Sequence, residues 1–292
     1  MADQLTFTVT SEYDGMNAGR YLRVVCKLSA RTLAKLKRTD GGLTVNGKLL
    51  RSIDTLNSGD TITIVLPAEN GETVTPVEGQ IDILYEDNFL LIVNKPPFMP
   101  VHPVKVHQTD TLANLVAYRY KEKDFVFRAV NRLDANTSGV VIISKDRHTA
   151  SVLQNTDIIK HYTAVCHGII LEKGTVDAPI SLRKDSKIVR CVDPLGQNAV
   201  THYTPVKYLD DATVVDVVLE TGRTHQIRCH MSHIGYPLFG DDLYGGTKEY
   251  INRQALHCHQ ISFVHPFTYE DICVSAPIPD DMQSLINSLK TG

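Results

Sequence analysis

Short runs of aliphatic and β-branched residues recur from Ile81 onward, and this recurrence limits the possible fold more than any other feature of the sequence. Stretches with helical periodicity are interspersed among these runs. Strands are expected at 90–94, 139–144, 162–166, 213–219 and 261–264, and helices at 112–120, 146–155 and 224–233. Strands mixed with helices in this way are typical of the α+β class. We therefore expect residues 81–292 to form an α+β domain.

The charge distribution separates the beginning of the chain from the rest. Residues 17–66 carry nine basic and three acidic side chains, a formal charge of +6, whereas the whole chain has a net charge of −3. Residues 67–87 contain six acidic side chains and no lysine or arginine. A local excess of positive charge favours binding to nucleic-acid phosphates, although a solvated helix face has the same composition.

The order of elements in this basic segment predicts a compact unit. Asn17 and Ser29 are each placed to cap a short helix, and Gly41-Gly42 ends the second one. Asn46-Gly47 then predicts a tight turn between a strand at 43–45 and the chain that leads to a second strand at 61–66.

This unit resembles the alpha-L RNA-binding module first named from a small-subunit ribosomal protein. The resemblance rests on A-G-R-Y-L at 18–22, S-A-R-T-L-A-K-L-K at 29–37, V-N-G-K at 45–48 and S-G-D-T-I at 58–62. It implies that the second helix presents basic side chains to RNA. The RNA-binding candidates are Arg20, Arg31, Lys35 and Arg38. We expect residues 1–16 to form an N-terminal strand or extension, 17–66 this module, and 67–80 a linker rich in Glu, Thr, Gly and Pro.

Composition narrows the remaining possibilities. The chain has 292 residues, of which 42% are hydrophobic, which suits one large and one small domain. No run approaches the ~18 apolar residues of a membrane span, and Met1 to Thr10 lacks the pattern of a signal peptide. The six cysteines are scattered without a C-x-x-C pair, which favours reduced thiols. A cytoplasmic protein is therefore expected, and a monomer is the default.

Three polar segments of the larger domain contain chemically useful side chains. The first is N-R-L-D-A-N-T-S-G at 131–139, where Asp134 stands on a loop just before an apolar strand and is open to a substrate. A turn in which Asp134, Asn136 and Thr137 cap one another is the alternative. The second is K-H-Y-T-A-V-C-H-G at 160–168, and the third is T-G-R-T-H-Q-I-R-C-H at 221–230. Taken alone, each segment also fits a structural role.

The third segment also raises the question of a metal site. His225, Cys229 and His233 follow one another at intervals of four residues, which places them on one face of a helix. No carboxylate or cysteine pair with suitable spacing accompanies them, so we expect no bound metal.

In their order along the chain, these segments resemble the RluA-type pseudouridine synthases. The resemblance also includes E-D-N-F-L-L-I-V-N-K-P at 86–96, V-H-P at 101–103 and G-x-P-x-x-G-D at 235–241, and it spans about residues 81–277. It implies a catalytic domain with a central mixed, mainly antiparallel sheet flanked by helices and loops. It also implies an RNA-modifying isomerase that uses no cofactor, on ribosomal RNA in preference to transfer RNA.

The resemblance assigns roles to individual residues. Asp134 corresponds to the catalytic aspartate, Tyr162 to the tyrosine of the K-x-Y segment, and Arg223 to the arginine that opens G-R-T-H-Q. Arg132 corresponds to the arginine that replaces the flipped-out base, and Ile227 to the residue that packs against uracil. Substrate binding is also expected of Asn131 and Thr137; Asn131 stands where the family usually has histidine, which affects the expected loop geometry.

The chemistry of uridine isomerisation suits these residues. Detaching uracil leaves an electron-poor sugar carbon, which a carboxylate such as Asp134 can attack or assist by removing a neighbouring proton. An adjacent guanidinium would keep the carboxylate ionised, and Arg223 is the expected partner, so Arg223→Ala should greatly slow turnover. Tyr162 is expected to accept or relay the proton that carbon 5 loses.

Two other functions compete with this interpretation. A non-catalytic RNA-binding or ribosome-assembly protein could share the fold, and a zinc-dependent hydrolase could use the histidines near His225. Neither the target RNA nor the target uridine follows from the sequence.

Overall fold

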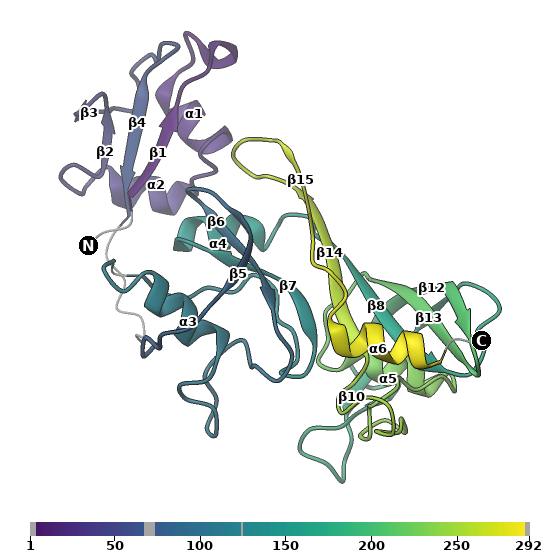
Figure 1. The fold of residues 1–292 in the computed structure, drawn as a ribbon. Helices are drawn as coiled ribbons and strands as arrows, with labels where there is room; N and C mark the ends of the chain where they lie inside the picture. Colours follow the sequence, from purple (N-terminus) through teal and green to yellow (C-terminus); the bar gives the residue numbers. More distant parts are fainter. Residues whose placement is uncertain (1–3, 67–73, 124, 290–292) are drawn as a thin grey trace.

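The computed structural model describes residues 4–66, 74–123 and 125–289. Figure 1 shows two parts, a small unit at the N-terminus and a larger one built on a long twisted sheet. Strands and helices of the larger unit are mixed along the chain, so the expected α+β class is confirmed.

The N-terminal unit is a four-stranded antiparallel sheet with two short helices. Its strands have the order β1-β4-β2-β3, and β1 pairs with β4 along its full length, so the first strand belongs to the same sheet as the basic segment. The elements are β1 (Gln4–Thr8), α1 (Ala18–Val24), α2 (Ala30–Leu36), β2 (Leu43–Val45), β3 (Lys48–Leu49) and β4 (Thr61–Val65).

Local signals in this unit act as the sequence predicts. The side chain of Asn17 accepts a hydrogen bond from the backbone of Arg20 at the start of α1, and Ser29 does the same for Thr32 in α2. Asn46 and Gly47 both have positive φ angles, 49° and 77°, as a type I′ hairpin turn requires.

An aromatic cluster joins the N-terminal unit to the larger one. The Phe7 ring lies 5.7 Å from that of Phe89 and 5.6 Å from that of Phe267. The Nε2 atom of His148 lies 2.5 Å from the carbonyl oxygen of Cys26, which adds a polar contact across the same boundary. Of the expected linker at 67–80, residues 67–73 lie outside the described residues.

The large sheet has nine strands in the order β5-β6-β7-β14-β8-β13-β12-β9, and β15 pairs with β14. The β14–β7 pairing is parallel and the other pairings of this sheet are antiparallel. Its strands are β5 (Asp82–Glu86), β6 (Leu90–Lys95), β7 (Ser138–Ser144), β8 (Ile159–His167), β9 (Gly174–Asp177), β12 (Val200–Leu209), β13 (Ala212–Leu219), β14 (Leu256–Val264) and β15 (Asp271–Ser275). The expected mixed, mainly antiparallel sheet is therefore present.

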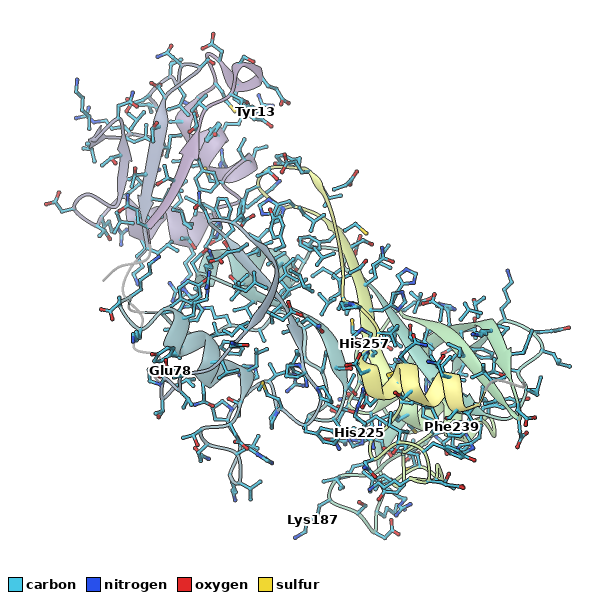
Figure 2. All side chains as sticks on the ribbon, in the orientation of Figure 1. Tyr13, Glu78, Lys187, His225, Phe239 and His257 are labelled. Atoms are coloured by element: carbon cyan, nitrogen blue, oxygen red, sulfur yellow. The ribbon has the colours of Figure 1, made fainter. Side chains whose placement is uncertain are left out.

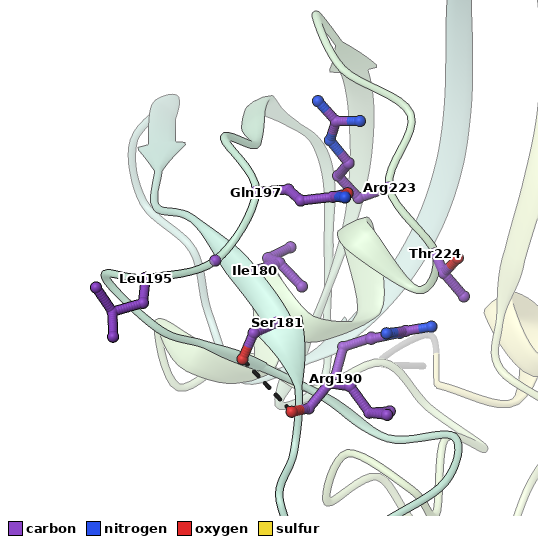
Figure 3. A pocket seen from close by; sticks show the side chains of 9 residues that line it. Ile180, Ser181, Arg190, Leu195, Gln197, Arg223 and Thr224 are labelled. Carbon is purple, nitrogen blue, oxygen red and sulfur yellow. Dashed lines mark hydrogen bonds between the residues drawn. The ribbon is translucent and has the colours of Figure 1, made fainter.

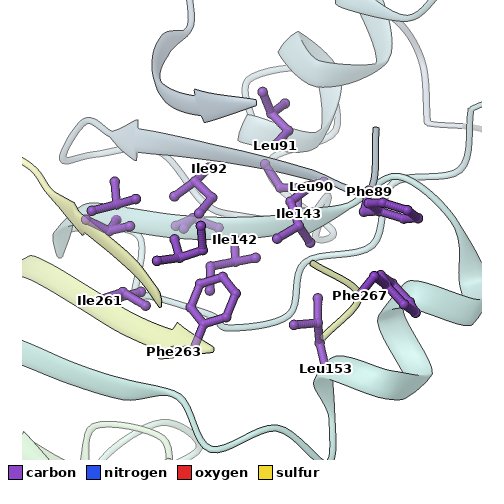
Figure 4. Packing of buried hydrophobic residues seen from close by; sticks show 14 of the residues in the cluster. Phe89, Leu90, Leu91, Ile92, Ile142, Ile143, Leu153, Ile261, Phe263 and Phe267 are labelled. Atoms are coloured by element: carbon purple, nitrogen blue, oxygen red, sulfur yellow. The ribbon is translucent and has the colours of Figure 1, made fainter. Parts of the chain in front are cut away.

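Helices and one hairpin complete the larger unit. These elements are α3 (Leu112–Arg119), α4 (Arg147–Leu153), the hairpin strands β10 (Ile180–Leu182) and β11 (Arg190–Val192), α5 (Gln226–His233) and α6 (Asp280–Ser288). Figure 4 shows the central core, where Leu91, Ile92 and Ile142 come from adjacent strands and are fully buried. Burial of these aliphatic side chains stabilises the sheet and holds the loops at its edges in place.

One glycine explains how the parallel strands β7 and β14 approach each other. Gly139 has a φ of 118°, and a Cβ atom there would lie 2.2 Å from the carbonyl oxygen of Cys258. Only glycine accommodates both the backbone conformation and this contact. The T-S-G sequence thus fixes the end of the Asp134 loop against β14.

None of the helices within residues 4–66, 74–123 and 125–289 combines the length and the apolar character that a membrane crossing requires.

Candidate active site

Asp134 lies on the loop that leads into β7, and Asn131 secures the beginning of that loop. The Asn131 side chain is buried; its Nδ2 atom donates to the carbonyl of Val140 at 3.1 Å, and its Oδ1 atom accepts from the amide of Ile142 at 2.8 Å. Both ends of the amide are thus used by β7. Asn131 therefore positions the loop, and its expected contact with the substrate stays a prediction.

Two buried cations hold the carbonyl groups that follow Asp134. The Lys95 ammonium donates to the carbonyl of Ala135 at 3.0 Å, and the Arg253 guanidinium donates to that of Asn136 at 3.1 Å. Burial, together with the charge of Arg253, lowers the pKa of Lys95 to about 7, although Asp134 acts in the opposite direction. The loop backbone is therefore restrained from two sides.

These two cations are anchored in turn by other groups. Lys95 also donates to the carbonyls of Pro96 and Met99, each at 2.8 Å. Arg253 forms a two-point ion pair with Asp281 at the start of α6, with distances of 2.6 and 2.8 Å. An element at the C-terminal end of the chain thus helps to position the loop that carries Asp134.

Helix α5 supplies the cation that faces Asp134. Arg228, in the first turn of this helix, places its Nη1 atom 3.1 Å from the Oδ2 atom of Asp134. Its Nε and Nη2 atoms bind Asp241 at 2.6 and 2.8 Å, a geometry that fixes the guanidinium plane. Burial would lower the pKa of Arg228, but Asp241 and Asp134 outweigh it and raise that pKa, so Arg228 remains charged.

The sequence led us to expect an ion pair between Asp134 and Arg223, but in the structure the arginine that pairs with Asp134 is Arg228. Arg223 precedes α5 and is exposed; its Nε atom donates to the carbonyl of Asn198 at 3.0 Å. Arg228 lies five residues further along, on the turn of the helix that faces Asp134. Arg223 nevertheless lines the same pocket as Asp134, within reach of a bound substrate.

The pocket around Asp134 has about 360 Å³ of empty space, part of it open to solvent. The residues that line it are Arg132, Leu133, Asp134, Thr137, Tyr162, Leu219, Arg223, His225, Gln226, Ile227, Arg228 and Leu256. His225, labelled in Figure 2, shows where this pocket lies in the fold. The three polar segments at 131–139, 160–168 and 221–230 therefore all contribute residues to this one pocket.

Apolar and aromatic groups form one wall of the pocket. Tyr162 of β8 and Ile227 of α5 are both buried, with 6% and 4% of their surfaces exposed. Burial, with smaller contributions from Cys258 and Asp134, raises the pKa of Tyr162 well above its usual value. Tyr162 is therefore a neutral phenol at physiological pH. A flat ring such as a base can lie against these two side chains.

The other expected substrate-binding residues differ in exposure. Arg132 is exposed at the rim, whereas Thr137 is buried and its Oγ1 atom accepts a hydrogen bond from Gln254 at 3.1 Å. His225 lies with its Nε2 atom 3.7 Å from Asp134, and burial lowers its pKa despite the nearby carboxylate. His225 therefore belongs to the active-site pocket.

A second, polar pocket adjoins the first and shares Arg223 with it. Figure 3 shows Arg190 of β11 together with Gln197 and Arg223 around this pocket, which has about 780 Å³ of empty space. Two arginines beside the active site give this region a positive charge that suits the phosphates of a nucleic acid.

Three residues that hold or face the Asp134 loop had no role in the expectations from the sequence. Lys95 and Arg228 lie within quoted motifs, N-K-P and H-Q-I-R, but no role followed from their spacing. Arg253 lies in no motif that the sequence singled out. A lysine or arginine inside an otherwise apolar stretch is the available signal, because such a residue is rarely buried without a partner.

The four expected RNA-binding side chains of the N-terminal unit are exposed. Arg31 and Lys35 project from α2, Arg38 follows in the next turn, and Arg20 lies on α1. Their positions are compatible with contacts to phosphates.

Comparisons with known proteins agree with this geometry. The family described as RNA pseudouridylate synthase matches residues 89–233. A Bacillus subtilis protein named "Uncharacterized RNA pseudouridine synthase YjbO" is 42% identical over 89% of this chain and 94% of its own length. "Ribosomal large subunit pseudouridine synthase D" of Buchnera aphidicola is 37% identical over 84% of this chain and 85% of its own.

A solved structure shares the fold. "Human RNA Pseudouridylate Synthase Domain Containing 1" superimposes with a TM-score of 0.57 at 24% identity, over 72% of this chain and 86% of that one. This likeness shows the fold, whereas the two relatives above, which match along most of their length, establish the family. The chain belongs to the RluA-type family of pseudouridine synthases, isomerases that act on RNA.

Proposed function

We propose that this enzyme converts uridines of ribosomal RNA to pseudouridine, with Asp134 as its catalytic carboxylate. The observation that carries the proposal is the position of Asp134, which lines one pocket together with Tyr162 and lies 3.1 Å from the buried cation Arg228. The name of the Buchnera relative supports ribosomal RNA as the substrate class. A cytoplasmic enzyme that acts as a monomer is part of the same proposal.

The reaction exchanges one bond to the sugar for another. The bond between C1′ of ribose and N1 of uracil breaks, the base turns, and C5 of uracil forms the new bond to C1′. Asp134 can attack C1′ or take the proton from C2′, and both routes need an ionised carboxylate. Arg228 favours that ionised form. The detached base is itself the returning nucleophile, so neither an activated water nor a cofactor is needed.

Extrusion of the target uridine precedes this chemistry. A stacked base must leave its helix at a cost of a few kcal/mol, which contacts inside the enzyme offset. The exposed side chain of Arg132, two residues before Asp134, is placed to occupy the vacated position. The extruded base would then lie against Ile227 and Tyr162.

Tyr162 takes part as a neutral phenol. Because burial raises its pKa, a phenolate that removes the C5 proton would be rare at pH 7. The hydroxyl group can relay this proton, receiving it on oxygen while passing its own to the Asp134 carboxylate, which lines the same pocket and is free again once C5 is bound to C1′.

Replacement of Tyr162 by phenylalanine tests this relay. The ring remains, so RNA binding should change little, whereas turnover should fall about 10²-fold, the lower range for loss of a proton-transfer group. Single-turnover assays of Tyr162→Phe with saturating enzyme would measure the bound-state rate. Full turnover in this variant would exclude the relay and leave only a packing role.

The N-terminal unit would act as a second RNA-binding site. Tethering one RNA at two modest sites raises the effective concentration at the catalytic pocket. Arg31, Lys35 and Arg38 supply the charge for this contact, and the unit is joined to the catalytic part through Phe7. Its loss should weaken RNA binding more than it slows the chemistry of bound RNA.

A triple variant of this helix makes the expectation measurable. Arg31→Gln/Lys35→Gln/Arg38→Gln should lower the slope of log affinity against log salt by about 2, because each phosphate contact contributes about 0.7–0.9. The single-turnover rate at saturating enzyme should stay near that of the wild type. The triple variant Lys123→Gln/Lys173→Gln/Lys207→Gln, exposed on the catalytic part, is the matched control. An equal loss of slope in both variants would contradict a specific RNA contact of α2.

The function itself is tested by a pseudouridine map of total RNA. Cells with and without the gene should differ at particular uridines of ribosomal RNA, and the wild-type gene should restore them. Differences confined to transfer RNA would contradict the substrate class but not the reaction. A map that does not change, despite expression of the protein, would favour a protein that acts by binding RNA.

A further inference from the structure

Three side chains with metal-binding atoms meet on the face of the large sheet opposite the active-site pocket. They are His161 of β8, Asp216 of β13 and His259 of β14. Side chains alternate along a strand, so His161 points away from the pocket that its neighbour Tyr162 lines. Among the residues that the structure describes, these form the one such group of three or more. His225, Cys229 and His233, which the sequence places at intervals of four residues, do not form such a group.

Strand geometry brings the three residues together. β8 pairs with β13 on one side and with β14 on the other. The register between β14 and β8 shifts between Cys258 and Gln260, so His259 is the extra residue of a β-bulge. A bulge changes the direction of a side chain. Here it brings the His259 ring to a centroid distance of 6.0 Å from that of His161.

The distances approach those of a metal centre. The Nδ1 atom of His161 lies 3.0 Å from Oδ2 of Asp216, and Nε2 of His259 lies 3.9 Å from Oδ1 of the same carboxylate. One ligand atom from each residue lies within 4.8 Å of the others. Ligand atoms at the usual bond length of about 2.0–2.1 Å from a tetrahedral zinc ion are about 3.3 Å apart. Small side-chain rotations therefore suffice for coordination.

Two further observations point to a ligand at this place. The Oδ1 atom of Asp216 is buried and has no hydrogen-bond partner among the described residues, an arrangement that is unfavourable for a carboxylate oxygen. The Nδ1 atom of His259 lies 3.0 Å from the hydroxyl oxygen of Thr163. When that nitrogen donates its proton to Thr163, the lone pair on Nε2 is directed at Asp216, as in the outer shell of zinc-bound histidines.

We propose that His161, Asp216 and His259 bind one divalent transition-metal ion, with zinc as the best fit and water in the fourth position. Two imidazoles and one carboxylate suit zinc, whereas magnesium and calcium prefer sites made only of oxygen atoms. The ion would satisfy the unpaired carboxylate oxygen and join three strands behind Tyr162. Binding of the ion does not depend on the proposed reaction.

Zinc binding by the purified full-length chain tests the proposal directly. Protein treated with a chelator and then titrated with zinc should bind one equivalent, measured by equilibrium dialysis and elemental analysis. Cobalt in place of zinc should give the visible spectrum of a tetrahedral site without an intense near-ultraviolet thiolate band, which excludes binding by cysteines. Zinc should also raise the melting temperature, because it binds only the folded site.

Matched variants locate the ion. His259→Ala should weaken zinc binding by more than the roughly 10- to 100-fold that loss of an outer-shell partner costs, and Thr163→Val by about that amount. Asp216→Asn serves the same purpose if His259→Ala does not fold. His202→Ala is the control, because His202 forms a comparable but exposed pair with Glu220 at 2.7 Å.

Wild-type protein without stoichiometric zinc would overturn the proposal, and the three residues would then be a plain histidine–aspartate network. Zinc binding that survives in both His259→Ala and Asp216→Asn, or that is lost equally in His202→Ala, would overturn it as well. Loss of zinc binding confined to the cluster variants supports it.

Discussion

Replacement of Asp134 by asparagine is expected to lower pseudouridine formation by about 10⁴-fold or more, the upper range for removal of a group that transfers protons or bonds covalently. The variant keeps the size of the side chain, and the loop backbone remains restrained by Lys95 and Arg253. The fold should therefore be intact. Release of tritium from C5-labelled uridine in a defined RNA would measure the reaction, and RNA affinity measured separately should remain close to that of the wild type.

A neighbouring acidic residue provides the control for Asp134. Asp242→Asn removes an exposed carboxylate that pairs with Lys248 at 2.6 Å, and it should retain turnover. Appreciable turnover by Asp134→Asn would exclude a direct role of this carboxylate in the reaction.

Replacement of Arg228 by methionine is expected to affect both stability and turnover. It leaves Asp241, of which 1% is exposed, as a buried carboxylate without its partner, which typically destabilises a protein by about 3–5 kcal/mol. It also removes the charge that faces Asp134, and turnover should fall by about 10²–10³-fold, as for loss of one preorganised electrostatic contact. Urea unfolding and single-turnover assays would measure the two effects.

A double variant separates these two effects. Arg228→Met/Asp241→Leu replaces the buried pair by apolar groups, which is often nearly neutral for stability. Stability should therefore recover, whereas turnover should not, because Asp134 still lacks its cation. Recovery of both would mean that Arg228 acts only through the fold.

Arg223 offers the comparison within the same segment. Its exposed guanidinium donates to the carbonyl of Asn198, so Arg223→Met should leave the unfolding free energy nearly unchanged. Any loss of turnover in this variant would then reflect contact with RNA. Arg223 was first expected to keep Asp134 ionised; in the structure Arg228, five positions later, is the arginine placed to do so.

The strands and helices whose apolar pattern is strong were predictable from the sequence. β6 and β7 are rich in aliphatic residues, whereas only 261–264 of β14 was expected; Asn17 and Ser29 cap the helices that they were expected to cap. Local signals of this kind act within a few residues, so they need no knowledge of the rest of the fold.

Elements with weak patterns were not predicted. β12 contains Pro205, which normally argues against a strand, and it is accommodated at an irregularity in the pairing with β13. β15 and α6 also went unpredicted; β15 pairs with β14, and Asp281 of α6 pairs with Arg253, 28 positions earlier. Pairing of this kind offsets a weak local preference for strand or helix.

The sequence by itself determined the family, the α+β class and the segments that form the pocket, because those properties reside in the order of short motifs. Tertiary structure alone decided which arginine faces Asp134. Arg223 and Arg228 stand in one motif. Because α5 begins at Gln226, Arg228 lies on its first turn and reaches Asp134, a carboxylate 94 positions away in the sequence. The same holds for His259, whose direction depends on a bulge between two strands. Side-chain direction follows from backbone geometry and long-range packing, and neither is local in the sequence.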